Sequence, residues 1–163
     1  MARKVQIAVI GGSEGAAKIL RDAETVGRGV AEAGAVLICG GRTGVMEAAS
    51  RGASEGGGTV IGILPTTEPE DANQYVTHAI ATGIGHARNL AVVASGDAVI
   101  AIGGEWGTLS EIAFARHLDR PVVALGSWAV SGPGAMEGGP GIVVADSPQD
   151  AVEEALRLAL PSH

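Results

Sequence analysis

Short apolar runs alternate with segments of helical pattern along this chain, and this alternation limits its fold more than any other feature. The runs occupy residues 5–10, 35–39, 59–64, 98–102, 121–125 and 142–145. Most successive positions within each run are apolar, which is typical of strands that are buried on both faces of a sheet. Strands of this kind that alternate with helices predict an α/β fold, with a mostly parallel sheet and helices on both faces.

Helical spacing of apolar side chains and local end signals place the helices between these runs. We predict helices over residues 16–33, 45–55, 86–95 and 108–118, and a last one that opens at Ser147. Gly34 suits the left-handed position after a helix, and Ser147-Pro148-Gln149-Asp150 is typical of a helix start. A short strand is predicted near residues 75–79. The Gly-, Ser- and Pro-rich residues 126–141 are predicted to form a surface loop.

Glycine makes up 26 of the 163 residues, more than twice its usual share of about 7%, and aromatic residues are few. The core must therefore consist of Val, Ile, Leu and Ala side chains, packed closely around small residues. The length predicts a single domain over residues 1–163. No apolar stretch approaches the roughly 18 residues that span a membrane, and the segment before the first run is too short for a signal peptide.

The net charge is −7 at pH 7, and no run of basic residues is longer than two. A nucleic-acid polymer requires a cationic surface, so we do not expect the chain to bind one. The single cysteine, Cys39, excludes an intrachain disulfide and a cysteine-based zinc site within one chain, and the four histidines lack close ligand spacing. We therefore expect no metal site, no membrane contact, and a reducing, cytoplasmic setting.

Three glycine-rich turns, at residues 11–15, 40–44 and 103–107, directly follow apolar runs. In a parallel sheet these turns lie at the carboxyl ends of the strands, where ligands of such folds bind. Glycine lets the backbone approach a ligand, and a helix that starts after the turn offers free N–H groups and a positive dipole end. The turns thus predict a site for a phosphate or another oxyanion, although the same glycines would also serve simply to make short strand–helix turns.

Common nucleotide-binding motifs are absent from these turns. The first turn, Gly11-Gly12-Ser13-Glu14-Gly15, lacks the Gly-x-Gly-x-x-Gly spacing of dinucleotide sites. No carboxylate follows the second run, which ends Cys39-Gly40-Gly41, and the chain has no Gly-x-x-x-x-Gly-Lys-Ser/Thr loop. We therefore expect neither NAD chemistry nor a P-loop ATPase.

Three segments of the chain resemble the LOG superfamily, long labelled lysine decarboxylase-like: Gly40–Met46, Gly57–Pro65 and Gly104–Glu111. The resemblance runs from about residue 4 to residue 160. This superfamily includes cytokinin-activating phosphoribohydrolases and molybdenum cofactor carrier proteins, so the resemblance implies a Rossmann-like domain and a small phosphorylated ligand. It also implies a homo-oligomer, a dimer or a tetramer, that pairs through helices beside the site.

The phosphoribohydrolases carry the motif PGGxGTxxE with an Arg-Lys pair upstream, and the resemblance assigns their two catalytic residues to Arg88 and Glu111 of this chain. Arg88 would hold and polarise the substrate, and Glu111 would assist the attack of water, as carboxylates do in sugar hydrolysis. Asn89 stands where the family has lysine, Glu105 where it has the second glycine, and Gly103 where it has proline. With these departures the motif looks more like the branch that contains the cofactor carriers.

The resemblance and the turns together give the candidate ligand- or phosphate-binding residues: Gly12, Ser13, Gly41, Arg42, Gly104, Glu105, Gly107 and Thr108. Thr108 and Glu111 also fit a capping box at a helix start. Trp106 is predicted either to stack on a flat ring or to lie at a subunit contact. Cys39 is predicted to be a small buried apolar residue and His86 an ordinary helix residue.

Two functions remain open. We favour a binding protein for a phosphorylated nucleotide-like or pterin ligand, with the molybdenum cofactor as cargo and no cofactor required. The alternative is a phosphoribohydrolase that cleaves a nucleoside 5′-monophosphate into base and ribose 5-phosphate. A lysine decarboxylase is not expected, because the only lysines are Lys4 and Lys18 and neither lies in a recognisable cofactor-lysine motif.

Overall fold

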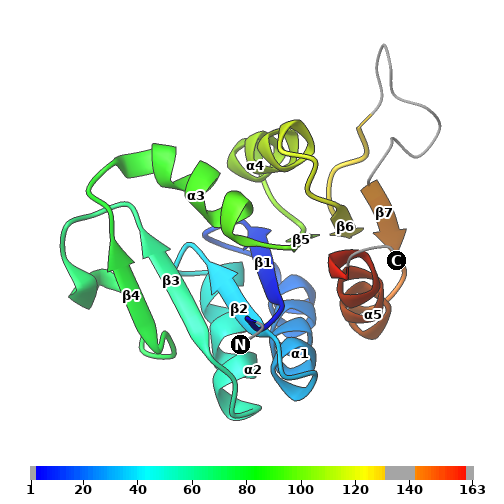
Figure 1. The fold of residues 1–163 in the computed structure, drawn as a ribbon, viewed down its shortest axis with the longest axis horizontal. Coiled ribbons are helices and arrows are strands. Elements are labelled where there is room, and N and C mark those ends of the chain that lie inside the picture. The colour runs from blue at the N-terminus through cyan, green and yellow to red at the C-terminus, as the bar shows by residue number, and fades with distance from the viewer. Residues whose placement is uncertain (1–2, 131–141, 161–163) are drawn as a thin grey trace.

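The computed structural model describes residues 3–130 and 142–160, and its strands form a seven-stranded sheet (Figure 1). Neighbouring strands run parallel, in the order β4-β3-β2-β1-β5-β6-β7. The strands are β1 (Gln6–Gly11), β2 (Val36–Cys39), β3 (Val60–Leu64), β4 (His78–Ala81), β5 (Ala98–Ile102), β6 (Val122–Leu125) and β7 (Ile142–Ala145). The predicted α/β fold with a parallel sheet is confirmed.

Helices cover both faces of this sheet, as predicted (Figure 1). One face carries α1 (Ala17–Glu32), α2 (Val45–Glu55) and α5 (Pro148–Ala159), and the other carries α3 (Arg88–Ser95) and α4 (Trp106–His117). Two short 3-10 turns, η1 (Pro69–Asp71) and η2 (Gly85–Ala87), precede β4 and α3. No helix in the described ranges is long and apolar enough to cross a membrane.

The sheet separates two apolar clusters, because successive side chains of a strand point to opposite faces. Ile7 and Val9 of β1 belong to the cluster under α1, α2 and α5. Ala8 and Ile10 belong to the cluster under α3 and α4. All four side chains are at most 1% exposed, which explains why residues 7–10 of the first run are all apolar.

The helices α1 and α2 contact each other backbone to backbone. A β-carbon at Gly27 would overlap the carbonyl oxygen of Ala49, and one at Gly52 would overlap the carbonyl oxygen of Glu24. Any residue other than glycine at these positions would push the two helices apart. Part of the glycine excess therefore serves helix packing rather than the turns of the site.

The strand order opens a crevice at the carboxyl edge of the sheet. β1 lies between β2 and β5, and the helices that follow β1 and β5 pack on opposite faces. Ligands of open α/β sheets bind where the strand order reverses in this way. The turns after β1 and β5 border the crevice, and Gly40 of the turn after β2 also reaches it.

The start of α4 differs from the prediction. The helix begins at Trp106 rather than Thr108, and Glu105 precedes it with extended backbone and without a side-chain capping bond. The N–H of Leu109 donates to the Glu105 carbonyl at 3.1 Å, so Thr108 already lies inside the first turn. The predicted capping box of Thr108 and Glu111 is therefore wrong, and both side chains are instead buried.

Other helix ends agree with their sequence signals. Gly34 follows α1 with φ +75°, and Ser147 accepts a hydrogen bond from the Asp150 N–H at 3.1 Å at the start of α5. The strand predicted near residues 75–79 begins only at His78. Of the predicted loop over residues 126–141, residues 131–141 lie outside the described part of the chain.

Candidate functional site

A cavity of about 280 Å³ lies at the carboxyl edge of the sheet, between the turn after β1 and the starts of α3 and α4. It brings together seven of the predicted residues: Gly12, Ser13, Arg88, Glu105, Gly107, Thr108 and Glu111. These residues come from three stretches that are far apart in the sequence. The fold therefore assembles one polar site from the first turn, the third turn and the start of α3.

Three predicted residues do not line this cavity. Gly41 is buried against β3, with φ +73°. The carbonyl of Arg42 accepts a hydrogen bond from Asn73 Nδ2 at 2.9 Å, and Arg42 Nη1 lies 3.9 Å from Asp71 Oδ2. The cation of Arg42 is thus paired beside the acidic loop before β4. Gly104 lines a neighbouring hollow on the other side of the turn after β5.

The first two glycine-rich turns hold each other in place. The Val45 N–H donates to the Gly12 carbonyl at 3.0 Å, and Thr43 Oγ1 donates to the Ser13 carbonyl at 3.0 Å. Gly44 has φ +70°, and a β-carbon there would overlap the backbone of Gly12 and Ser13. The wall of the cavity after β1 is therefore fixed by the turn after β2 before any ligand arrives.

Arg88, the first residue of α3, supplies the positive charge of the cavity. Its guanidinium lies directly over Gly40, where a β-carbon would overlap Nη1. Its Nε is buried and has no hydrogen-bond partner among the described residues. Burial lowers the pKa of Arg88, and the nearby Glu111 carboxylate partly opposes this effect. A buried donor without a partner costs free energy unless a ligand satisfies it, so Arg88 is prepared to bind an anion.

Glu111 of α4 is 6% exposed and lies in the same cavity. Burial raises the pKa of its carboxyl to about 7, and Arg88 opposes that rise. No ion pair within 4.0 Å joins these two side chains in the described part of the chain. The carboxyl is thus close to half-ionised at neutral pH and leaves the guanidinium available.

The first turn of α4 provides a second attraction for an anion. The N–H groups of Gly107 and Thr108 belong to the helix start, where no intrahelical acceptor exists, and both residues line the cavity. The positive end of the helix dipole adds to this field. Glu105 lines the same cavity and is exposed, so solvent screens its negative charge more than that of a buried carboxylate.

Sequence analysis did not assign Gly40, Met46 and His86 to the cavity, although all three line it. Two of these residues have positions that could have indicated the site. His86 lies two residues before Arg88, and Gly40 is the first glycine after a strand. Cys39 behaves as predicted, because it is buried and its Sγ accepts a hydrogen bond from the Gly41 N–H at 3.3 Å. Burial raises the pKa of its thiol.

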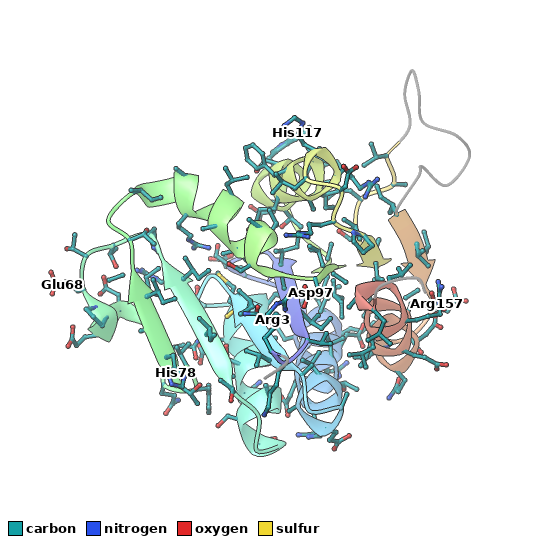
Figure 2. The ribbon with its side chains drawn as sticks, viewed as in Figure 1. Arg3, Glu68, His78, Asp97, His117 and Arg157 are labelled. Atoms are coloured by element: carbon teal, nitrogen blue, oxygen red, sulfur yellow. The ribbon has the colours of Figure 1, made fainter. Side chains whose placement is uncertain are left out.

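Other titratable side chains lie apart from this cavity. Figure 2 shows His78 on β4 and His117 at the end of α4, far from each other. Among the described residues, no group of three His, Cys, Asp or Glu side chains is placed to hold a metal ion. Arg3 and Asp97 form an ion pair at the opposite, amino-terminal edge of the sheet, with Arg3 Nη1 2.7 Å from Asp97 Oδ2 (Figure 2). Arg88 is thus the cation that the fold commits to the cavity.

One known protein family and two related sequences match this chain. The model of the SLOG cluster4 family matches residues 4–152. An uncharacterized protein of Archaeoglobus fulgidus is 46% identical over 121 residues, which cover 74% of this chain and 80% of that protein. A cytokinin riboside 5′-monophosphate phosphoribohydrolase of Rhodococcoides fascians is 37% identical over 93 residues, or 55% of this chain. The matched part spans about half of that enzyme, 47% of its length.

Solved structures of similar proteins match nearly the whole chain. The molybdenum cofactor binding protein of Rippkaea orientalis superposes with a TM-score of 0.87 at 35% identity, covering 98% of this chain and all of that one. The molybdenum cofactor carrier protein of Chlamydomonas reinhardtii superposes with a TM-score of 0.82 at 33% identity, covering 96% and 98%. The resemblance to a LOG-like superfamily and to its cofactor-carrier branch is therefore confirmed.

Proposed function

The chain belongs to the SLOG cluster4 family, and from that premise we propose that it binds the molybdenum cofactor as a carrier. Support comes from the two cofactor-binding proteins that match it along nearly their whole length. The cofactor is a pterin that bears a phosphate, so a carrier requires an anion site but no bond cleavage. The chain treats this cofactor as cargo and needs no resident group of its own.

The observation that carries this proposal is the state of Arg88. Its Nε is buried without a partner, its guanidinium is fixed over Gly40, and Glu111 does not neutralise it by a close ion pair. Gly107 and Thr108, whose N–H groups have no intrahelical acceptor, line the same space. A phosphate in the cavity would satisfy these donors together, with charge-assisted bonds that are roughly twice as strong as neutral ones.

Binding of the isolated cofactor to the purified protein tests this proposal. We expect the wild-type chain to retain the cofactor through gel filtration and the Arg88→Ala variant to lose it. Arg42→Ala is the matched control, because Arg42 lies after the neighbouring strand but outside the cavity. Retention by Arg88→Ala, or equal loss in both variants, would contradict the assignment of the phosphate to this cavity.

A second candidate function is the hydrolysis of a nucleoside 5′-monophosphate to base and ribose 5-phosphate. The specific observation in its favour is that Arg88 and Glu111 share the cavity and that the pKa of Glu111 is near 7. A carboxyl of this kind is able to accept a proton from attacking water at neutral pH. The relative from Rhodococcoides fascians bears the name of such an enzyme.

Incubation with AMP distinguishes the enzyme from the carrier. If the chain is a phosphoribohydrolase, adenine and ribose 5-phosphate appear in equal amounts, and Glu111→Gln abolishes their release while it preserves the shape of the side chain. Glu105→Gln is the control, since Glu105 lies at the rim of the same cavity but is exposed. The absence of both products at high protein concentration would rule out this activity for AMP.

The outer surface of α3 and α4 supports the proposal of a homo-oligomer. Leu90 of α3, Phe114 of α4 and Leu118 directly after α4 are 37–42% exposed. Large apolar side chains grouped on neighbouring helices are typical of a subunit contact. We expect the purified protein to have the mass of a dimer or tetramer in analytical ultracentrifugation, and Phe114→Glu to yield monomers. A wild-type monomer at high concentration would refute this contact.

A further inference from the structure

The two tryptophans of the chain lie together beside the cavity. The ring centroids of Trp106 and Trp128 are 5.1 Å apart, and their planes are inclined by 38°. Trp128 Nε1 donates to the Glu105 carbonyl at 3.1 Å, so the second ring is fixed to the residue that precedes α4. Trp106 itself stands between Glu105 and Gly107, which both line the cavity. The aromatic pair is therefore attached to the rim of the anion site.

Trp106 is unusually exposed for so large a ring. Its side chain is 76% exposed, the highest value among the large apolar residues of the described chain. Burial of an indole is among the largest apolar contributions that a side chain offers, so a tryptophan left in water at a helix start adds little to folding stability. Exposed aromatic surface next to a polar cavity is typical of a recognition surface.

The cavity around Arg88 is at the small end of the range for ligand sites. Its volume is about 280 Å³, below the roughly 300–1,000 Å³ of sites that bury whole ligands. A second hollow of about 510 Å³ lies across the turn after β5, and its lining includes Gly103, Gly104 and Trp128. The same five-residue turn, 103–107, contributes residues to both spaces. The turn thus separates the anion cavity from a second space on its other side.

The second hollow is kept open and apolar by its backbone. Gly103, Gly104 and Gly126 have φ values of +56°, +105° and +55°, which residues with side chains rarely adopt. Ser127 Oγ donates to the Gly103 carbonyl at 2.6 Å and joins the turn after β6 to the turn after β5. No charged side chain lines this hollow in the described residues. It thus offers a smooth surface for stacking and no charge to bind a second anion.

We propose that Trp106 and Trp128 form a stacking platform for the flat fused ring of the ligand whose phosphate binds at Arg88. This inference rests on the proposed function and extends it, because it divides the ligand between an anion cavity and an aromatic platform. Stacking recognises the π-face rather than the edge of a heterocycle. The platform therefore accepts both pterins and purines. The part of the ligand that links its ring to its phosphate decides which ring reaches the platform.

Two probes separate the platform from the anion cavity: ribose 5-phosphate, which has no ring, and neopterin monophosphate, which has both. The pterin side chain is joined by a carbon–carbon bond, so a phosphoribohydrolase has no N-glycosidic bond to cut in this probe. Because the chain contains only two tryptophans, indole fluorescence reports on the platform alone. We expect neopterin monophosphate to quench this fluorescence and ribose 5-phosphate to leave it unchanged.

Isothermal titration of variants then measures the contribution of stacking. Trp106→Ala should weaken neopterin monophosphate about tenfold and leave ribose 5-phosphate within about twofold of the wild type. Trp106→Phe, which keeps an aromatic face, should recover most of the lost affinity. Trp128→Phe should retain binding with less quenching, since Phe keeps a ring but loses the hydrogen bond to Glu105.

Three outcomes would contradict the stacking platform, and each has a different explanation. If neither probe binds the wild-type protein, the proposed function fails and the platform fails with it. If both probes bind but Trp106→Ala weakens them equally or not at all, the anion site stands and the platform is refuted. If Trp106→Ala instead changes only the mass of the oligomer, the ring belongs to a subunit contact and the platform is again refuted.

Discussion

The two faces of the sheet are covered in different ways. On one face, Gly27 and Gly52 bring the backbones of α1 and α2 into contact, and neither helix has a large exposed apolar side chain. On the other face, α3 and α4 leave Leu90 and Phe114 each 42% exposed. The α1–α2 pair on the first face is closed at atomic contact distance, whereas α3 and α4 on the second face still have apolar surface to bury.

The charged groups of the cavity come from the less closed face. Arg88 belongs to α3 and Glu111 to α4, whereas α2 contributes only the apolar Met46 to the lining. Burial shifts the pKa of both charged groups, because it disfavours their charged forms. Keeping these groups in the cavity therefore lowers the free energy of unfolding. One face thus supplies the stability that the other face gives up for binding. Four substitutions test this division.

The largest effect is expected at Gly52 of α2. Alanine normally stabilises a helix interior relative to glycine, but here its β-carbon would overlap the Glu24 carbonyl on α1. We expect Gly52→Ala to lower the free energy of unfolding by about 3 kcal/mol, measured by urea denaturation. Gly107→Ala on α4 is the control, because a β-carbon there meets no atom within 4 Å. Equal stability of the two variants would show that the α1–α2 contact is not tight.

The next effect concerns the pH dependence of stability. The folded-state pKa of Glu111, about 7, lies above the ordinary value of 4.5, so the folded state binds more protons than the unfolded chain between these pH values. Stability must then fall as pH rises through this window, by on the order of 2–3 kcal/mol in total. Glu111→Gln should remove this fall, and Glu105→Gln should keep it. A wild-type stability that is flat from pH 4.5 to 7 would contradict the buried carboxyl.

A smaller effect is expected on ligand affinity at Gly40. A β-carbon at this position would displace the Arg88 guanidinium, which lies over it. Gly40→Ala should weaken ribose 5-phosphate about tenfold, or about 1.4 kcal/mol, in isothermal titration. Arg42→Ala, at a residue outside the cavity, should change the affinity much less. If Gly40→Ala binds as tightly as the wild type, Arg88 is not the anion contact.

The smallest effect is expected at Leu90 on the open face. At low protein concentration, where subunits are apart, Leu90→Gln should change the free energy of unfolding by only about 0.5 kcal/mol. Val26→Ala, in a fully buried position of α1, should cost about 2 kcal/mol. Thermal denaturation of the two variants compares the faces directly. A cost at Leu90 equal to that at Val26 would mean that both faces are equally closed.

The fold could be predicted from the sequence because buried parallel strands leave a distinct signal. The run Val5–Ile10 is apolar at nearly every position, since its side chains reach both clusters. The start of α4 could not be predicted in the same way. Thr108 resembled a cap, whereas the actual cap is the extended backbone of Glu105, which has no sequence signature.

The candidate site was predicted in part for related reasons. The resemblance identified Arg88 and Glu111, and the structure places both in one cavity. Sequence alone could not separate Arg88 from Arg42, because each follows a strand at the same edge. Their difference is tertiary: Asn73 holds the backbone of Arg42 and Asp71 attracts its side chain, and both lie about 30 residues further along.

The placement of Arg88 over Gly40 has a consequence for how related sequences should be sorted. The arginine occupies the volume that a missing side chain at position 40 leaves free. The two positions are therefore coupled, and an arginine at position 88 can take this place in the cavity only when position 40 is glycine. A homologue that keeps the arginine but carries a larger residue in place of Gly40 must hold its anion in another way, and should not be assigned the same ligand from the arginine alone.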